Sequence, residues 1–142
     1  MTETFEDIAE NFEFIDEWED RYRYVIELGK AMTPMDPSLQ IPATKVDGCA
    51  SQVWIAPDIK GEGAEARITF TGASDAMIVQ GLIAVLHALY NDKAPKDILA
   101  IDPETVLGRL GLDQHLSSQR SNGLKAMVTR IRDIATKVLE KS

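Results

Sequence analysis

The sequence predicts an α+β fold in which a small antiparallel sheet of about three strands packs with several helices. Three observations support this fold class. Short runs with strand character lie on either side of a glycine-containing connection, residues 58–65. One segment, residues 75–90, is apolar on nearly every side of a helix, and amphipathic helical stripes stand near both ends of the chain. At 142 residues, without a linker, a repeat or a low-complexity tract, the chain is expected to form one domain, residues 1–142.

Two helices are expected ahead of the sheet. The apolar residues of the first helix follow one helical stripe, at Phe5, Ile8, Ala9 and Phe12. Thr4 is its expected cap. The second helix is expected from about Asp16 to Leu28, with Gly29 as a natural stop. Prolines then exclude a regular helix between Thr33 and Gly48, which leaves an ordered crossing or a mobile loop there.

The sheet is expected to begin with a short edge strand at Thr44–Val46. A second strand follows at Ser51–Ala56, where Pro57 is expected to stop it. Residues 66–71 alternate between apolar and polar side chains, which is typical of a half-buried antiparallel strand. Gly72 is the expected end of that strand.

The rest of the chain is expected to be mostly helical. The central helix runs roughly from Asp75 to Tyr90, after a start at Ser74, and its all-round apolar surface predicts that it forms the backbone of the core. Gly81 inside this helix indicates that another element crosses closely there. Further helices are expected at 95–99, at 103–110 with Asp102 as cap, and from about 124 to 139 after a polar loop at 112–120.

Composition excludes several classes of function. The net charge is -8 and the sequence has no basic stripe, which argues against a nucleic-acid partner. A single cysteine excludes an internal disulfide and a zinc cage built from several thiolates. The longest apolar stretch, residues 77–89, is too short to span a bilayer, and the acidic start lacks the features of a signal peptide. We therefore expect a cytoplasmic protein without a membrane partner.

The single cysteine, Cys49, is the candidate reactive residue. It follows Gly48 and precedes a strand, so a turn can hold the thiol rigidly on one side and offer it to a partner on the other. The thiolate is the nucleophilic form of the side chain, and partial exposure suits it. The competing interpretation is a small buried core residue, which is the usual role of a free cysteine. The residues alone leave both interpretations open.

Other polar residues carry weaker signals. His87 lies in the apolar central helix and is best interpreted as a core histidine, whereas His115 lies in the polar loop. Glu62 stands between two glycines and is best interpreted as a turn residue. Arg120, just before the last helix, could orient an anion or lower the pKa of a thiol, or it could be an ordinary surface arginine. No metal-ligand spacing, nucleophile elbow or phosphate-binding loop accompanies these residues.

Four segments in a fixed order together resemble the SufE family of sulfur-acceptor proteins, which includes CsdE-like members. These segments are Trp18–Gly29, Val46–Trp54, Ser74–Leu82 and Arg120–Met127. The resemblance covers nearly the whole chain after Asp16 and implies a fold similar to that of SufE and of IscU-type scaffolds. Because the chain lacks the several cysteines that a scaffold needs, we expect it to relay sulfur rather than to assemble clusters.

The resemblance implies a partner and a reaction. A PLP-dependent cysteine desulfurase of the SufS or CsdA type would pass persulfide sulfur to Cys49, and the chain would stimulate that enzyme. The sulfur would then reach an iron–sulfur scaffold of the SufBCD type. One thiol suffices for this exchange, and the PLP belongs to the partner, so neither a cofactor nor a metal is expected here. The protein would be a persulfide carrier and activator rather than a stand-alone enzyme.

The resemblance also assigns supporting roles near the cysteine. Asp75 and Arg120 match family positions near the cysteine loop and the partner surface. Gly48, Ser51 and Gln52 are expected to shape or hold the loop. We further expect the loop to shelter Cys49 at rest, which would raise the pKa of its thiol, and to expose it on docking.

Two alternatives stay open at this stage. One is a binding module that only activates the desulfurase. The other is a CsdE-like relay that feeds RNA modification or other thio-cofactor pathways. A homodimer is also compatible with the sequence.

Overall fold

The sheet is a two-stranded antiparallel hairpin. The computed structural model describes residues 4–49, 51–112 and 116–140. Strand β1 (Val53–Lys60) pairs with β2 (Arg67–Ser74) from Val53 opposite Ser74 to Lys60 opposite Arg67, and the short 3-10 turn η2 (Gly63–Glu65) joins them. The α+β class is therefore confirmed, but the sheet has two strands within the described residues rather than the expected three or so. The expected edge strand at Thr44–Val46 forms only an isolated bridge, between Lys45 and Trp54.

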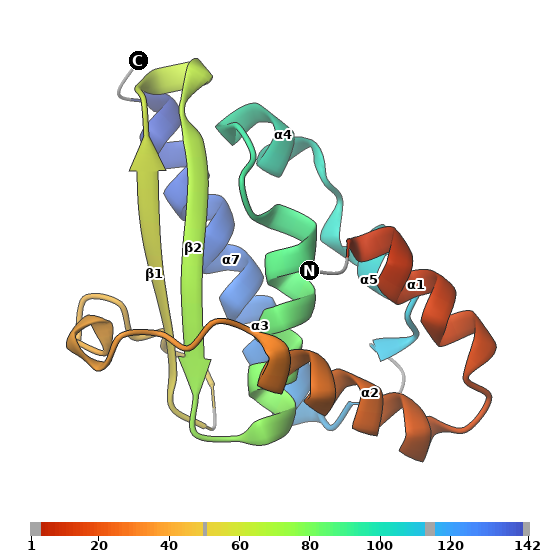
Figure 1. Ribbon diagram of the computed structural model, residues 1–142. Coiled ribbons are helices and arrows are strands. Elements are labelled where there is room, and N and C mark those ends of the chain that lie inside the picture. Colours follow the sequence, from red (N-terminus) through yellow and green to blue (C-terminus); the bar gives the residue numbers. More distant parts are fainter. Residues whose placement is uncertain (1–3, 50, 113–115, 141–142) are drawn as a thin grey trace.

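Helices cover the hairpin. They are α1 (Phe5–Phe14), α2 (Trp18–Ala31), α3 (Met77–Tyr90), α4 (Pro95–Ala100), α5 (Pro103–Gly108) and α7 (Ser118–Glu140), with a 3-10 turn η1 at Pro37–Leu39. Figure 1 shows α7 passing behind the hairpin, α3 rising beside β2, and α2 crossing the lower part of α3, with α1 beyond it. Within the residues that the structure describes, no helix is long and apolar enough to cross a membrane.

Helices α2 and α3 cross at two glycines. A Cβ atom added to Gly29 would lie 2.6 Å from the backbone nitrogen of Gly81, and one added to Gly81 would collide with the carbonyl oxygen of Val25. The close crossing expected at Gly81 is thus confirmed. The expected stop at Gly29 is wrong, because α2 continues to Ala31 and uses this glycine for contact instead.

Polar side chains of α3 and of Asn91, the residue that follows it, cover the outer edge of β2. The Gln80 side-chain carbonyl accepts a hydrogen bond from the Ser74 amide (2.8 Å), and the Asn91 side chain accepts one from the Phe70 amide (2.9 Å). His87 is half-buried, stacks edge-on against Phe70 at 5.2 Å and bonds to its backbone. These three residues, together with backbone bonds between Ile68 and residues 92–93, give β2 the partners that an edge strand needs. His87 therefore has the structural role expected of a core histidine.

Both strands are longer than expected, for two physical reasons. The backbone N–H and C=O groups of Val53 and Ile55 face residues 44–46, on the edge of β1 away from β2. Because these groups alternate along a strand, the backbone nitrogen of Pro57 faces the same outer edge. A proline without an N–H is tolerated at that edge, so β1 runs on to Lys60. Gly72 does not end β2 either. Its missing side chain admits Ile83 of α3, whose Cγ2 would lie 2.5 Å from an added Cβ.

Two helix starts differ from expectation. Helix α3 begins at Met77 rather than at Asp75, because the Ser74 hydroxyl accepts the Ala76 amide and holds a turn ahead of the helix (3.2 Å). Helix α7 already begins at Ser118, where the expectation was a polar loop as far as Arg120. The Ser117 hydroxyl accepts the Arg120 amide (3.2 Å), so Arg120 stands in the first helical turn. His115, expected in the polar loop, lies outside the described residues.

The two capping predictions for the shorter helices are confirmed. Thr4 caps α1 and exchanges hydrogen bonds with Asp7. Asp102 caps α5 by accepting the Glu104 amide (3.1 Å), although this helix ends at Gly108 rather than near residue 110.

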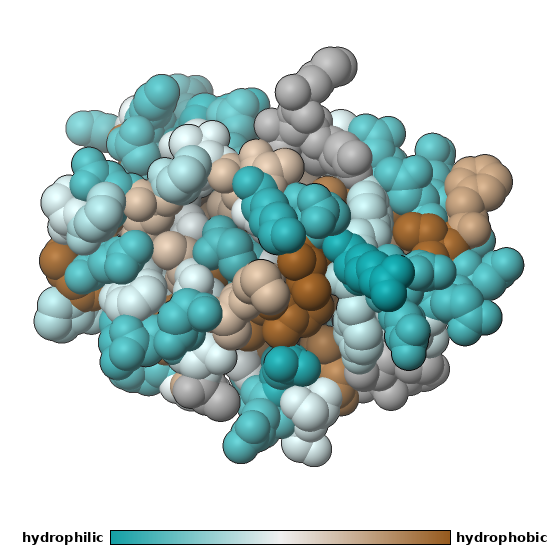
Figure 2. All heavy atoms as spheres, turned by 60° about the horizontal axis from the view of Figure 1, so that its bottom comes forward, coloured by the Kyte–Doolittle hydropathy of each residue, from teal (hydrophilic) through white to brown (hydrophobic). Residues whose placement is uncertain are grey.

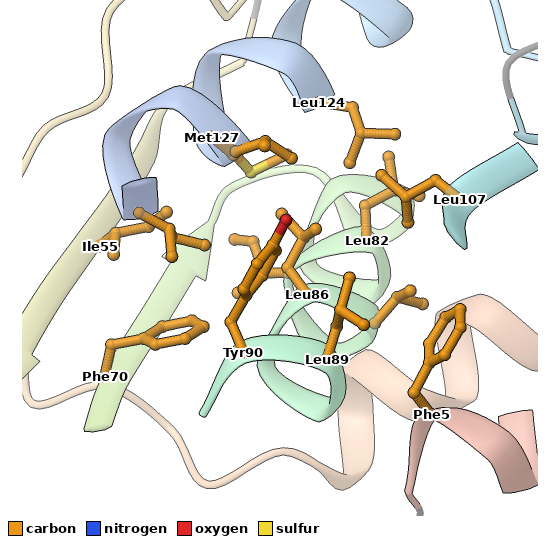
Figure 3. Packing of buried hydrophobic residues seen from close by; sticks show 14 of the residues in the cluster. Phe5, Ile55, Phe70, Leu82, Leu86, Leu89, Tyr90, Leu107, Leu124 and Met127 are labelled. Carbon is orange, nitrogen blue, oxygen red and sulfur yellow. The ribbon is translucent and has the colours of Figure 1, made fainter. Parts of the chain in front are cut away.

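One hydrophobic core joins these elements. Figure 3 shows side chains from α1, the hairpin, α3 and α7 converging around the central helix, among them Phe5, Phe70, Leu86, Tyr90 and Met127. Burying each large apolar side chain contributes about 1.5–3 kcal/mol to stability. The prediction that the central helix is the backbone of the core is confirmed, and its first turn ends up beside the cysteine segment.

Candidate functional site

The segment around Cys49 lies between the start of β1 and helix α7. We call residues 45–49 together with 51–52 the Cys49 loop. At its beginning, the Val46 amide donates to the Val53 carbonyl (2.8 Å). The Arg130 guanidinium of α7 donates to the carbonyls of Lys45 (2.6 Å) and Ala43 (3.3 Å). A charged donor thus holds the start of the loop against α7.

The other end of the loop is held by Asp75. The Gln52 amide donates to the Asp75 carboxylate (3.0 Å), and the Asp75 amide donates to the Gln52 carbonyl (3.4 Å). Both bonds use the backbone of Gln52. Asp75, which precedes α3, is therefore a loop anchor in this structure, and the loop is fixed at both ends.

Gly48 shapes the turn that presents the cysteine. Its φ angle is 91°, a conformation that residues with a Cβ rarely adopt. An added Cβ would also lie only 3.3 Å from the Cβ of Ala126 on α7. The turn therefore requires glycine for its backbone and for its close approach to the helix, as the sequence predicted for the backbone.

The Cys49 side chain is half-buried against Gly123 of α7. Its thiol donates a hydrogen bond to the Gly123 carbonyl oxygen, with 3.6 Å between sulfur and oxygen. A Cβ added to Gly123 would lie 3.5 Å from the sulfur, so the glycine leaves the thiol in contact with helix backbone. The thiol is sheltered at rest but is not sealed in the core.

A small cavity adjoins the thiol. Its volume is about 20 Å³, and it is lined by Cys49, Ser51, Val79, Leu82, Gln119, Arg120, Gly123 and Met127. Such a volume accommodates about one small atom or water molecule. Three of the residues predicted to belong to the site, Cys49, Ser51 and Arg120, therefore meet at one cavity, although Arg120 arrives from a helix rather than a loop.

The electrostatic environment keeps the thiol protonated. Burial raises the pKa of the Cys49 thiol above its ordinary value, and the nearby Asp47 carboxylate raises it further. Each cause disfavours the negative thiolate. Arg120 is not among the causes of this shift, and the net change in the Cys49 pKa is upward.

Three residues that shape the Cys49 site were not predicted individually from the sequence. Asp47 was visible beside Gly48, but only the fold shows that its charge opposes ionisation of Cys49. Gly123 stood in a segment that carries the family resemblance, and a glycine inside an amphipathic helix is itself a sign of close approach. Arg130 lies 85 residues from Lys45 and had no local signal.

The remaining candidates lie elsewhere. Glu62 precedes the η2 turn at the far end of the hairpin, and His87 lies at the β2 edge. Within residues 4–49, 51–112 and 116–140, no three His, Cys, Asp or Glu side chains gather as a metal ion would need.

Comparisons with known proteins agree on one family. The sequence matches SufE, described as an Fe-S metabolism associated domain, over residues 6–135. It is 46% identical over 132 residues to an uncharacterized SufE-like protein of Rhizobium meliloti, covering 93% of this chain and 94% of that relative. A second uncharacterized SufE-like protein, of Rhizobium etli, is 47% identical over 132 residues and is covered to 89%, against 93% of this chain.

A solved structure shares the fold. The solution structure of a hypothetical protein from Thermus thermophilus superposes with a TM-score of 0.74, covering 96% of both chains. The sequence identity to it is 19%, so this likeness supports the fold alone.

Proposed function

The chain belongs to the SufE family, and on that premise we propose that Cys49 accepts sulfur from the persulfide of a PLP-dependent cysteine desulfurase. Membership of this family supports a sulfur-acceptor role in iron–sulfur metabolism. The single observation that carries the proposal is the setting of Cys49. The only thiol of the sequence stands on a glycine turn, anchored at both ends and in contact with the Gly123 carbonyl.

The proposed step is a thiol–disulfide type of exchange. The Cys49 thiolate attacks the outer sulfur of the partner's persulfide, a new sulfur–sulfur bond forms, and the partner's own sulfur–sulfur bond breaks. The partner cysteine leaves as a thiolate and takes up the proton that Cys49 gave up. A persulfide and a thiol are consumed and a persulfide and a thiol are formed, so no oxidant or reductant is required.

The resting structure opposes the first event of this step. Burial and Asp47 both raise the pKa of Cys49, so the thiolate is scarce in the free protein. We propose that docking of the desulfurase moves the Cys49 loop away from Gly123 and lets the thiol ionise. Such shelter would protect reactive sulfur against oxidation and against loss to other thiols.

Downstream transfer to a SufBCD-type scaffold is part of the same proposal. The chain would act with the desulfurase, which supplies PLP and cleaves the carbon–sulfur bond of cysteine. None of the Cys49 loop contacts requires a cofactor in this chain. Asp75 and Arg120 would serve at the docked surface as well as in the resting loop and cavity.

Substitution of the acceptor separates relay from activation. Cys49→Ser keeps the size of the side chain, so we expect a folded protein that binds the desulfurase but no longer raises its turnover. The measurement is sulfide release by the desulfurase with increasing amounts of wild-type chain or variant. Full stimulation by Cys49→Ser would reject the relay and favour a pure binding activator.

A further inference from the structure

A second hollow adjoins the cysteine cavity. It is a groove of about 340 Å³ between α2 and the start of α3, lined by Tyr22, Ile26, Ala76, Met77, Ile78 and Arg120. The bottom of the molecule in Figure 1 comes forward in Figure 2, where hydrophobic side chains gather near the centre of a largely hydrophilic face. Four of the six lining residues are aliphatic or methionine, so replacing water in the groove by an apolar side chain is favourable.

Met77 is the most unusual residue of this groove. It is the first residue of α3, and its exposed fraction is 65%. Large apolar side chains exposed beside a hollow mark interaction sites more often than isolated ones do. Methionine is also flexible enough to fit a partner of irregular shape. Phe14, at the end of α1, is exposed to 85% but does not line this groove.

The groove and the Cys49 cavity share a lining residue. Arg120 lines both the groove and the cavity beside Cys49. Val79, two residues after Met77 in α3, lines the same cavity. A sulfur–sulfur bond can form only when the partner's reactive cysteine reaches Cys49, so a partner of ordinary interface size also covers the groove.

We propose that this groove receives an apolar side chain of the desulfurase, on a segment that also carries a carboxylate facing Arg120. This inference rests on the proposed function and names the part of the surface that recognises the partner. Met77 and Ile26 supply the apolar contact. Among the described residues that line the groove, Arg120 is the only charged one, and a guanidinium selects a carboxylate on the partner. Recognition therefore combines one buried apolar anchor with one ion pair at the rim of the Cys49 cavity.

The test compares two exposed apolar residues. Met77→Glu places a charge in the groove, Met77→Leu keeps an apolar side chain there, and Phe14→Glu makes the same chemical change away from it. Binding of each variant to the cognate cysteine desulfurase is measured by calorimetry, beside circular dichroism of the free chain. We expect Met77→Glu to raise Kd at least about tenfold, since one buried anchor commonly carries that much affinity. Met77→Leu and Phe14→Glu should stay within about twofold of wild type.

The ion pair has its own readout. Arg120→Gln should weaken binding and reduce its dependence on salt concentration, because a partly screened charge pair is lost. If Arg120→Gln left the salt dependence of binding unchanged, the proposed pairing of Arg120 with a carboxylate of the partner would be wrong.

The outcomes separate this inference from the proposed function. Equal effects of Met77→Glu and Phe14→Glu on binding, or no effect of either, would overturn the proposed role of the groove. The proposed function would still stand if the wild-type chain gained sulfur at Cys49. If Met77→Glu changed only self-association in sedimentation, a second copy of the chain would occupy the groove and the inference would also fail. If binding depended on Met77 but the wild-type chain gained no sulfur on Cys49, the groove would stand and the sulfur relay would be overturned.

Discussion

Strand β1 has a glycine turn at each end, and different parts of the chain hold the two turns. At the hairpin end, Gly61 (φ 88°) and Gly63 (φ 60°) lead directly into paired strands, and the Ala66 amide bonds to the Gly63 carbonyl (3.2 Å). At the other end, Gly48 adopts a similar φ of 91°, but partners 23, 74 and 85 residues away hold the loop.

The difference teaches how a fold separates a structural turn from a functional one. The hairpin turn is fixed by its sequence neighbours, so opening it would break the strand pairing. Apart from the Val46–Val53 backbone bond, the Cys49 loop is held by a few hydrogen bonds to α7 and to Asp75, so we expect it to open without unfolding the sheet. Local openings of this kind cost less free energy than global unfolding.

The largest expected effect comes from removing the anchor on α7. Arg130→Ala deletes the donors to Lys45 and Ala43, and one hydrogen bond to a charged group contributes about 1.5–3 kcal/mol. Because these groups are solvent-accessible, we expect the low end, which corresponds to about a tenfold larger open population. The alkylation rate of Cys49 by iodoacetamide should rise about tenfold.

Arg67→Ala is the matched control for this change. Arg67 forms an exposed ion pair with Asp92 near the hairpin end, at 3.5 Å. Its loss should leave the alkylation rate nearly unchanged. If both arginine variants accelerated the reaction equally, the loop would have no special dependence on α7.

A second prediction concerns the Asp75 anchor. Asp75→Ala removes the acceptor for the Gln52 amide and should raise the Cys49 alkylation rate several-fold, about five times. Asp75→Asn retains an acceptor oxygen, so it should react almost as slowly as wild type. Hydrogen exchange at the Gln52 amide is the direct readout, and identical exchange in both variants would contradict the anchor.

Paired glycine substitutions sharpen the comparison between the two turns. Gly48→Ala and Gly61→Ala each force a Cβ into a positive-φ conformation, at a cost of about 1–2 kcal/mol in unfolding free energy. Denaturant unfolding should therefore show similar losses. Only Gly48→Ala should change the alkylation rate of Cys49, and a change in both variants would mean that the turns are coupled.

The smallest expected effect is electrostatic. Asp47→Asn removes the second cause of the raised Cys49 pKa, while burial, the larger cause, remains. The thiol pKa should fall but stay above its ordinary value. The alkylation rate plotted against pH should therefore shift to lower pH without a change in its plateau, and an unshifted profile would contradict a role for Asp47.

Sequence reasoning found features that a residue signals by itself and missed contacts that no single residue signals. Gly81 revealed the α2–α3 crossing, and Gly48 indicated the turn that presents Cys49. Pro57 misled because a proline ends a strand only where its N–H is needed, and here it faces the outer edge. Arg130 could not be found, because nothing local links a helix arginine to carbonyls 85 residues away.

The central claim is that Cys49 itself becomes the sulfur carrier. The most direct measurement is the intact mass of the chain after incubation with its cysteine desulfurase and cysteine, followed by peptide mapping. The account predicts a gain of one sulfur atom located on Cys49, absent when cysteine is omitted and absent in Cys49→Ser. An unchanged wild-type mass, while the desulfurase turns over and binds the chain, would contradict it.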